Sequence, residues 1–547
     1  MEQYKANLNK WLNNPNIDDD SKKELENLDE NELKERFYKN LEFGTAGLRG
    51  ILGAGTNRMN IYNIRICSQG FASYLIKNFE NPTAAISYDS RNFSKIFAEE
   101  TALVFSANGI KTYIYKEMRP TPQLSFTINS MGLSGGVMIT ASHNPKEYNG
   151  YKVYGCDGAQ VSSPKDEQII SFVNNTNLED VKTISIEEAK SKGLLTEILE
   201  EYDEKFIEKT LSLSNTKPKN INVVYTPLHG VGLFPIKEVF KRANVENLIL
   251  VDEQSEPDSS FGNLKLPNPE EADVFEEAIK IAKENNAPLI LATDPDADRV
   301  GICVLDENSG EYVHLQGNQI GIILCEYILY SKHEKGTLTK NDGIITSVVS
   351  SKLTSQIAKY YNVHIETVFT GFKNVAAQIR KWEKEGINFI YGFEESFGYQ
   401  IGSHIRDKDG IGPSLILTEI ASQKNLLVYL EEIYKKYGYY AEETTQITIK
   451  GIEGAEKIKN IMEFLRVNPP KVLAGNEIIE TIDYMPKSNV LYYSLEDEGF
   501  ICIRPSGTEP KIKIYAGVKG ETKAEGQNKV KKIKQDFLNI IKIGTDF

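Results

Sequence analysis

The chain has 547 residues and a formal net charge of −14, with 40% hydrophobic and 26% charged residues. This composition is typical of a folded globular protein, so it excludes a chain that is mostly disordered or fibrous. At about 150 residues per domain, the length predicts three or four domains. The acidic balance argues against nucleic acid or an anionic membrane surface as a partner, although a local group of Arg and Lys could still bind a small anion.

No run of about 18 apolar residues exists, so the sequence predicts no membrane-spanning helix. Residues 1–11 are polar and do not resemble a signal peptide. The five cysteines are widely spaced and contain no CxxC pair, which is typical of a chain in a reducing compartment. We therefore expect a cytoplasmic protein with neither a disulfide framework nor a zinc site.

The first forty residues predict amphipathic helices, because apolar residues recur among charges at helical spacing. After Gly50, short β-rich runs alternate with longer helical runs in three rounds, a pattern that predicts three similar α/β domains with mixed or parallel sheets. The predicted strands are residues 84–88, 111–115, 136–140, 221–225, 248–251, 288–293, 300–305, 343–349, 363–367 and 389–393. The predicted helices are residues 61–78, 94–108, 234–243 and 352–360.

The last hundred residues predict a C-terminal α+β domain. Its expected strands are residues 446–449, 490–495, 499–503 and 511–517, and its expected helices are residues 454–466 and 522–541. Boundaries near 205, 317 and 440 divide the chain into residues 1–205, with the helical extension, 206–317, 318–440 and 441–547. Each of these four parts contains one loop with chemically useful side chains.

The first loop, Thr140-Ala-Ser142-His143-Asn144-Pro145, follows a predicted strand, where α/β proteins display reactive groups. A serine hydroxyl is a weak nucleophile that needs a base or a metal. His143 is adjacent, and Lys152 downstream could hold a phosphoryl group. Alone, the motif is equally compatible with a plain Ser/Asn turn, and the absence of GxSxG argues against an α/β-hydrolase.

The second loop, Asp294-Pro-Asp296-Ala-Asp298-Arg299, lies between two predicted strands. Oxygen ligands on a tight loop suit a hard cation, above all Mg²⁺, and such close carboxylates repel one another without a cation. An EF-hand is a poor fit, since the flanks are strands. The alternative is a solvated acidic turn.

The third loop, Gly392-Phe-Glu394-Glu395-Ser396-Phe-Gly398, follows another apolar run. Two carboxylates and a hydroxyl at a strand end suit hydrogen bonds to sugar hydroxyls, while paired glutamates are also found in glycoside hydrolases. The segment Arg406-Asp-Lys408-Asp-Gly410 follows, and its simplest interpretation is a charged hairpin turn.

The fourth loop, Arg504-Pro-Ser506-Gly507-Thr508-Glu-Pro-Lys511, combines an Arg fork for phosphate with hydroxyls and an approachable backbone. It is not a Walker A sequence, and alone it is also compatible with a β-turn. Arg49 in a Gly-rich segment and Lys373 are further candidates for anion contacts. His229 is the one other histidine with a functional alternative.

Together and in this order, the four loops resemble the α-D-phosphohexomutase family over essentially the whole chain from Gly44. The GFEESFGY form is similar to the phosphoglucomutase and phosphopentomutase branches more than to the bacterial phosphomannomutase/phosphoglucomutase branch. The resemblance implies a phosphoserine domain, a metal-binding domain, a sugar-binding domain and a phosphate-binding domain around a central cleft.

The resemblance also implies site residues. Ser142 would be carried as phosphoserine and bind one Mg²⁺ per chain with Asp294, Asp296 and Asp298. The expected catalytic group comprises Ser142, His143, Lys152, Arg49 and Lys408. The expected substrate-binding group comprises Arg299, Glu394, Ser396, Arg504, Ser506, Gly507, Thr508 and Lys513.

The implied activity is an isomerase reaction, the reversible interconversion of α-D-glucose 1-phosphate and glucose 6-phosphate through glucose 1,6-bisphosphate, which would also be the activator. Alternatives are a pentose-phosphate mutase, a phosphomannomutase or a glucose 1,6-bisphosphate synthase. A Mg²⁺-dependent DxD phosphatase, needing neither Ser142 nor the fourth loop, and a silent scaffold are remoter hypotheses. We expect a small sugar phosphate as partner, and a monomer or homodimer.

Overall fold

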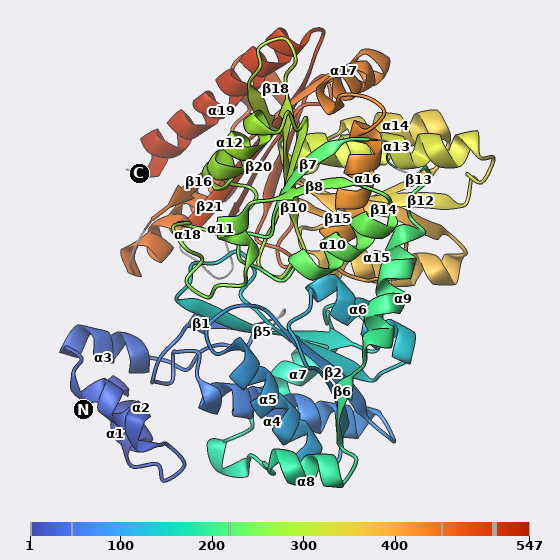
Figure 1. Ribbon diagram of the computed structural model, residues 1–547. Helices are drawn as coiled ribbons and strands as arrows, with labels where there is room; N and C mark the ends of the chain where they lie inside the picture. Colours follow the sequence, from blue (N-terminus) through green and yellow to red (C-terminus); the bar gives the residue numbers. More distant parts are fainter. Residues whose placement is uncertain are drawn as a thin grey trace. The chain divides into compact units, whose positions relative to one another are not determined.

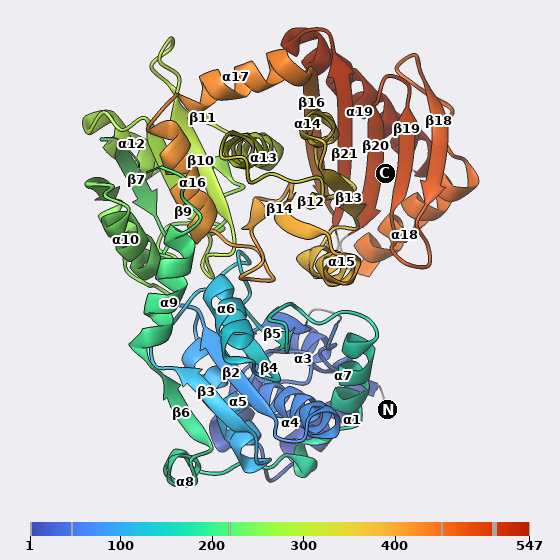
Figure 2. The same cartoon turned by 90° about the vertical axis from the view of Figure 1, so that its right-hand side faces the viewer.

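The computed structural model describes residues 3–44, 47–216, 218, 220–449, 452–505 and 511–545. Figures 1 and 2 show the chain as a ribbon coloured along the sequence. The chain forms two compact units. The first unit contains Met1–Gly317 and Gly371–Asn425, and the second contains Asn318–Thr370 and Leu426–Phe547. Each unit is therefore assembled from two separate stretches of sequence.

The N-terminal segment forms three short helices, as its apolar spacing predicts. These are α1 (Gln3–Leu12), α2 (Asp19–Glu26) and α3 (Glu30–Phe37). Asp18 and Asp29 cap the second and third helices, because each carboxylate accepts a hydrogen bond from the backbone N–H three residues later. Trp11 packs edge-on against Phe37 and Tyr62, and this cluster attaches the helices to the first α/β domain.

The first α/β domain is built on a six-stranded sheet in the order β1-β5-β4-β2-β3-β6. Strand β5 is antiparallel to β1 and β4, whereas β4, β2, β3 and β6 are parallel. The strands are β1 (Gly47–Ile51), β2 (Thr83–Tyr88), β3 (Lys111–Tyr115), β4 (Gly135–Ile139), β5 (Tyr148–Gly155) and β6 (Leu195–Ile198). The helices are α4 (Ile61–Asn78), α5 (Ser94–Ala107), α6 (Thr121–Met131), α7 (Lys165–Asn174), α8 (Ile186–Ser191) and α9 (Glu200–Leu211), with the 3-10 turn η1 (Leu178–Asp180).

The second α/β domain has a five-stranded sheet in the order β11-β10-β9-β7-β8. Strand β10 is antiparallel to β9 and β11, and the other neighbours are parallel. Its strands are β7 (Asn222–Thr226), β8 (Asn247–Leu250), β9 (Leu289–Thr293), β10 (Val300–Leu305) and β11 (Tyr312–His314). Its helical segments are α10 (Leu233–Arg242), α11 (Asp252–Ser255), η2 (Ala272–Phe275) and α12 (Glu276–Glu284).

The third α/β domain is divided between the two units. The first unit holds its antiparallel strands β14 (Asn388–Glu394) and β15 (Gly398–Ile401) and helices α15 (Phe372–Glu385) and α16 (Ile411–Ala421). The second unit holds the parallel strands β12 (Asp342–Ser347) and β13 (His364–Val368), with helices α13 (Gly317–Glu334), α14 (Leu353–Tyr361) and α17 (Leu426–Tyr437).

The rest of the second unit is an antiparallel sheet in the order β16-β21-β20-β19-β18-β17, covered by two helices (Figure 2). The strands are β16 (Tyr439–Thr448), β17 (Val472–Leu473), β18 (Asn476–Asp483), β19 (Leu491–Leu495), β20 (Phe500–Pro505) and β21 (Lys511–Gly520). The helices are α18 (Ile452–Val467) and α19 (Lys523–Thr545).

The predicted fold class of three α/β domains with mixed sheets and a C-terminal α+β domain is confirmed. The predicted strand 446–449 was wrong at its start, because β16 begins at Tyr439. The boundaries at 205, 317 and 440, and the central cleft, stay predictions. Among the described helices, none combines the length and apolar character that a membrane crossing requires.

Candidate active site

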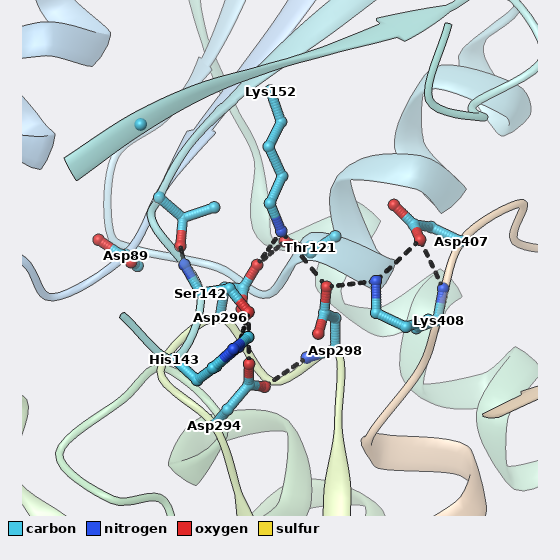
Figure 3. Close-up of polar contacts among 12 residues, drawn as sticks. Asp89, Thr121, Ser142, His143, Lys152, Asp294, Asp296, Asp298, Asp407 and Lys408 are labelled. Atoms are coloured by element: carbon cyan, nitrogen blue, oxygen red, sulfur yellow. Dashed lines mark hydrogen bonds and ion pairs between the residues drawn. The ribbon is translucent and has the colours of Figure 1, made fainter. Parts of the chain in front are cut away.

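Ser142 lies in the hairpin that joins β4 to β5. Its Oγ donates a 2.8 Å hydrogen bond to Asp294 Oδ2 and lies 3.1 Å from His143 Nδ1 (Figure 3). Ser142 has φ +52° and is almost fully buried, and its backbone N–H donates to Thr140 Oγ1. A non-glycine residue in the left-handed region is costly and is held there by its surroundings. A plain Ser/Asn turn does not account for this arrangement, because Ser142 is buried and bonded to the second loop.

The antiparallel ribbon of β1 and β5 positions two cations beside this hairpin. Arg49 on β1 lies opposite Gly150 of β5, and its Nη1 donates a 2.8 Å hydrogen bond to Asn144 Oδ1 in the serine loop. Lys152 is on β5, opposite Met138 of β4. The two predicted basic residues thus come from adjacent strands, although their separation in sequence is large.

The three aspartates of the second loop form the hairpin between β9 and β10, and all three are fully buried. Asp294 organises the turn, because its Oδ1 accepts hydrogen bonds from the backbone N–H groups of Asp298 and Arg299 at 3.1 and 3.0 Å. Ala297 takes φ +50° inside this turn. The alternative of a solvated acidic turn is wrong.

This loop fits a divalent cation. Each aspartate offers an oxygen atom, and these atoms lie within 4.8 Å of one another. Asp296 Oδ1 and Asp298 Oδ1 are buried, and no donor among the described residues forms a hydrogen bond with either atom, a costly arrangement that a cation would relieve. Burial, followed by the neighbouring Asp296 and Asp298 carboxylates, raises the pKa of Asp294 well above its usual value. Three oxygen donors of this kind suit a hard metal ion.

Carboxylates and ammonium groups alternate around the loop in the order Asp296, Lys152, Asp298, Lys408, Asp407, which we call the charge chain (Figure 3). Lys152 Nζ lies 2.6 Å from Asp296 Oδ2 and 3.3 Å from Asp298 Oδ2. Lys408 Nζ lies 2.9 Å from Asp298 Oδ2 and 3.5 Å from Asp407 Oδ1. The segment 406–410 is therefore part of a buried cluster, which its interpretation as a charged hairpin turn does not account for.

The charge chain changes the pKa values of its members. Burial by itself would lower the pKa of Lys152, but Asp296 and Asp298 outweigh burial and raise it. Burial by itself would raise the pKa of Asp407, but Lys408 and Lys152 outweigh burial and lower it. The charge chain thus keeps its members ionised in a buried position where an isolated charge would be unstable.

Backbone contacts fix the third domain's loops on the metal loop. The Gly410 N–H donates a 3.0 Å hydrogen bond to the Ala297 carbonyl, and the Val300 N–H donates to the Phe397 carbonyl. Gly398 lies against the stem of Lys408, since a Cβ at this position would be 2.2 Å from Lys408 Cδ. The serine, metal and Lys408 loops are accordingly one connected site within the first unit.

The two predicted sugar contacts, Glu394 and Ser396, lie at the turn between β14 and β15, just before Gly398. Glu394 ends β14, is mostly buried, and accepts a short hydrogen bond from the Gly371 N–H. Ser396 lies in the turn between β14 and β15. Arg299 follows the metal loop, with its Nε 3.9 Å from Asp298 Oδ1 and its Nη1 3.7 Å from Glu270 Oε2.

The predicted phosphate-binding residues belong to the second unit. Arg504 on β20 lies directly opposite Lys513 on β21, and Arg504 Nη1 donates a short hydrogen bond to Thr370 Oγ1. Like charges at directly opposed strand positions repel, and an anion between them would remove that repulsion. Ser506, Gly507 and Thr508 lie outside the described residues.

Two other candidates have simpler surroundings. Lys373 Nζ lies 3.8 Å from Asp166 Oδ2, and burial, partly offset by Asp166, lowers the pKa of this lysine. His229 Nδ1 lies 3.2 Å from the Glu256 carbonyl. Both residues are engaged with groups outside the charge chain.

The sequence prediction missed residues that hold the site. Thr121 at the start of α6 donates its hydroxyl to Asp296 Oδ2 at 2.7 Å, and its N–H to the Asp296 carbonyl at 3.0 Å. Tyr154 and Gln160 donate to Asp407 Oδ2, each at 2.8 Å. Their partners lie more than 140 residues away in the chain, so no local pattern marks them.

Comparison with known proteins places this site in a family. Three phosphoglucomutase/phosphomannomutase models match, for alpha/beta/alpha domain I at residues 40–180, domain II at 200–308 and domain III at 316–437. The chain belongs to this family. It is an enzyme of the isomerase type that transfers a phosphoryl group within its substrate, as the four-loop resemblance implies.

A curated relative agrees with this assignment, and two solved structures share the fold. A phosphoglucomutase of Staphylococcus aureus (strain MRSA252) is 36% identical over 512 residues, which cover 89% of this chain and 91% of the relative. The solved putative phosphomannomutase of Thermus thermophilus is 19% identical, with a TM-score of 0.72 and coverage of 92% and 99%. The solved parafusin, a phosphoglucomutase of Paramecium, is 20% identical, with a TM-score of 0.67 and coverage of 93% and 95%.

Proposed function

We propose that the protein interconverts α-D-glucose 1-phosphate and glucose 6-phosphate through a phosphorylated Ser142. The observation that carries the proposal is the hydrogen bond from Ser142 Oγ to Asp294, which joins a hydroxyl nucleophile to a buried three-aspartate cluster. The family assignment and the Staphylococcus relative named phosphoglucomutase support the choice of sugar.

In the proposed reaction, the bond between Ser142 Oγ and phosphorus breaks while a sugar hydroxyl forms a new bond to the same phosphorus. The sugar hydroxyl loses its proton, Ser142 Oγ gains one as it leaves, and the product is glucose 1,6-bisphosphate. The bisphosphate then turns over, and Ser142 Oγ loses its proton as it takes the other phosphoryl group, while the released sugar oxygen gains a proton. Glucose 1,6-bisphosphate would also rephosphorylate enzyme that has lost its phosphate.

Asp294, Asp296 and Asp298 would hold one Mg²⁺ together with an oxygen of the phosphorylated serine. When bound, this ion offsets negative charge on the transferring group. Lys152 and Lys408 add positive charge beside the same carboxylates, which is the electrostatic route expected for phosphoryl transfer. His143 lies within reach of the serine oxygen, and Arg49 is held on the serine loop.

The proposed substrate contacts follow the division of the chain into residues 1–205, 206–317, 318–440 and 441–547. Glu394 would accept hydrogen bonds from sugar hydroxyls, and Ser396 would donate one to a sugar oxygen. Arg299 would face the same substrate. Arg504, Ser506, Gly507, Thr508 and Lys513 would bind the phosphate that is not being transferred. A monomer or homodimer and a cytoplasmic location remain expectations.

A coupled assay tests the proposal. Wild type, Ser142→Ala and the control Ser73→Ala, whose hydroxyl bonds a helix carbonyl, are compared on glucose 1-phosphate with Mg²⁺ and a trace of glucose 1,6-bisphosphate. We expect turnover in wild type and control, and a loss of at least about 1,000-fold in Ser142→Ala. Full activity in Ser142→Ala would exclude the phosphoserine route.

The same assay separates the alternatives. If ribose 1-phosphate with its bisphosphate is turned over faster than glucose 1-phosphate, the substrate is a pentose phosphate. If mannose 1-phosphate is turned over faster, the enzyme is a phosphomannomutase. Phosphate release that survives Ser142→Ala but is lost in Asp294→Ala would indicate a phosphatase. Intact-mass measurement after incubation with glucose 1,6-bisphosphate reports directly whether Ser142 gains a phosphoryl group.

A further inference from the structure

Arg91 is a fully buried arginine beside the serine loop that the proposed chemistry does not use. It follows β2 in the sequence Asp89-Ser90-Arg91, and its side chain has no exposed surface. Burial lowers the pKa of Arg91 to about 10, so its guanidinium group is still charged near neutral pH. A buried charge of this kind needs compensating contacts.

Those contacts are almost all with the backbone of the serine loop. Arg91 Nη2 donates to the carbonyls of Ser142 and Asn144, at 2.6 and 2.5 Å. Arg91 Nη1 donates to the carbonyls of Pro145 and Tyr148, both at 2.9 Å. One guanidinium fork thus spans the loop from the serine to the start of β5, which a lysine ammonium lacks the geometry to reproduce.

Both sides of the guanidinium group are also supported. Asp89 Oδ2 lies 3.4 Å from Arg91 Nε, and Asp89 Oδ1 accepts hydrogen bonds from the Arg91 N–H and from Ser94 Oγ. The ring of Phe261, from the second domain, lies 4.9 Å from the guanidinium carbon, at cation–π distance. Arg91 therefore joins the serine loop of one domain to a buried aromatic residue of another.

We propose that Arg91 is a positioning residue for phosphoryl transfer, which holds the Ser142 carbonyl so that Ser142 Oγ faces the aspartate cluster. Ser142 has the left-handed φ of +52°, a conformation that the loop must impose on a residue with a side chain. The carbonyl contacts of Arg91 supply that constraint through the backbone of the loop. The proposal rests on the proposed function, since it concerns how Ser142 is presented for the same reaction.

The test compares Arg91→Met and Arg91→Lys with wild type and with Arg65→Met. Arg65 is a matched control in the same domain, because it makes a bidentate pair with Glu100 and contacts no serine-loop carbonyl. We expect kcat to fall by about 100-fold in Arg91→Met, the effect of an approximately 1 Å misplacement of a reacting group, with KM within about threefold of wild type. Arg91→Lys should lie close to Arg91→Met, and Arg65→Met close to wild type.

Three further readouts separate positioning from folding. The rate at which glucose 1,6-bisphosphate phosphorylates Ser142, followed by intact mass, should fall with kcat. Added guanidinium ion at low concentration should raise the activity of Arg91→Ala and leave Arg65→Ala unchanged. Phe261→Leu, which keeps apolar volume and removes the ring, should lower kcat less than Arg91→Met does and keep the Tm near that of wild type.

A wild type without mutase activity would contradict the proposed function itself. With an active wild type, the inference fails if folded Arg91→Met keeps kcat within about threefold, or if its loss of activity equals its loss of folded protein. It also fails if the serine is phosphorylated at the wild-type rate in Arg91→Met and Phe261→Leu.

Discussion

In the first compact unit, the buried Asp296 and Asp407 lie against the ammonium groups of Lys152 and Lys408, whereas in the second unit Glu442 lies against a hydroxyl group. Glu442 on β16 accepts a short hydrogen bond from Ser351 Oγ. Burial raises the pKa of Glu442 to about 7 despite that bond, while the lysines hold the pKa values of Asp296 and Asp407 below their usual range. Full positive charges, and not hydrogen bonds alone, keep buried carboxylates ionised here.

The same contrast appears within one loop. Asp407 and Asp409 are two residues apart and both fully buried. Asp409 accepts hydrogen bonds from the backbone N–H groups of Ile411 and Gly412, and burial raises its pKa to about 6. The loop therefore places ionised groups toward the metal loop and a readily protonated group at the start of α16. Charge is concentrated where phosphoryl transfer is proposed.

Removing a cation from the charge chain should have the largest effect. Lys152→Met removes the ammonium group that pairs with Asp296 and leaves Asp298 with Lys408, so we expect a loss of about 3–5 kcal/mol of stability in metal-free protein and at least a 100-fold fall in kcat. The control is Lys111→Met at the exposed start of β3. Thermal unfolding with and without Mg²⁺, and the mutase assay, measure both effects. A kcat of Lys152→Met equal to that of wild type would show that the charge chain does not contribute to catalysis.

Asp407→Asn should have a smaller effect, because the amide oxygen can still accept from Tyr154 and Gln160 while the charge is lost. Lys408 would then keep Asp298 as its charged partner, and we expect kcat to fall by about tenfold with little change in Tm. Asp409→Asn is the matched variant without a lysine partner, and it should retain activity. Equal losses in both variants would show that loop shape, and not the charge on Asp407, matters.

Glu442 provides a pH test in the other unit. Its folded-state pKa of about 7 lies above the usual 4.5, so its contribution to the free energy of unfolding is complete below about pH 4.5 and is lost as the pH rises through about 7. Glu442→Gln keeps an acceptor for Ser351 and cannot ionise. We therefore expect the variant to match wild type at pH 5 and to exceed it by about 1–3 kcal/mol at pH 8.

Glu443→Gln, the neighbouring residue that pairs with Lys534, is the control for this measurement. Its difference from wild type should not follow the pH pattern of Glu442→Gln. The Tm of each variant is recorded between pH 5 and 8. A Tm difference for Glu442→Gln that stays constant over this range would mean that the carboxyl group does not titrate there.

An exposed carboxylate should matter least. Asp29 caps α3 by accepting a hydrogen bond from the Glu32 N–H at 2.9 Å, and Asp29→Ala should cost about 1 kcal/mol with kcat unchanged. Asp29→Asn, which retains a capping oxygen, should recover most of this loss in a thermal unfolding experiment. A large loss of activity in Asp29→Ala would show that this cap affects the active site as well as stability.

Much of the fold was predictable because periodic apolar patterns mark the interiors of α4 and β10, whose predicted bounds agree with the structure. The start of β16 was missed, since Glu442 and Glu443 interrupt its apolar pattern. Strand β18 was missed because most of its residues are exposed. The local apolar pattern does not predict a strand that is stabilised by pairing with other strands and not by burial of its side chains.

The site shows the same limit. Ser142 and the three aspartates were found because each group occupies one short loop after an apolar run. Thr121 and Arg91 were not found, as their function depends on contacts with residues brought together by folding. The segment around Lys408 was also compatible with a charged hairpin turn, because its bonds to Tyr154 and Gln160 join residues that are distant in sequence.

At Gly398, the absence of a side chain governs the position of a charged group. Its backbone lies so close to Lys408 that a single methyl group would occupy the space of the lysine stem. Gly398→Ala would therefore displace an ammonium group while leaving every ionisable residue of the sequence in place. For protein engineering, this means that a library which preserves all charged residues can still disrupt the ion pairs of the site, because one larger side chain at Gly398 displaces Lys408.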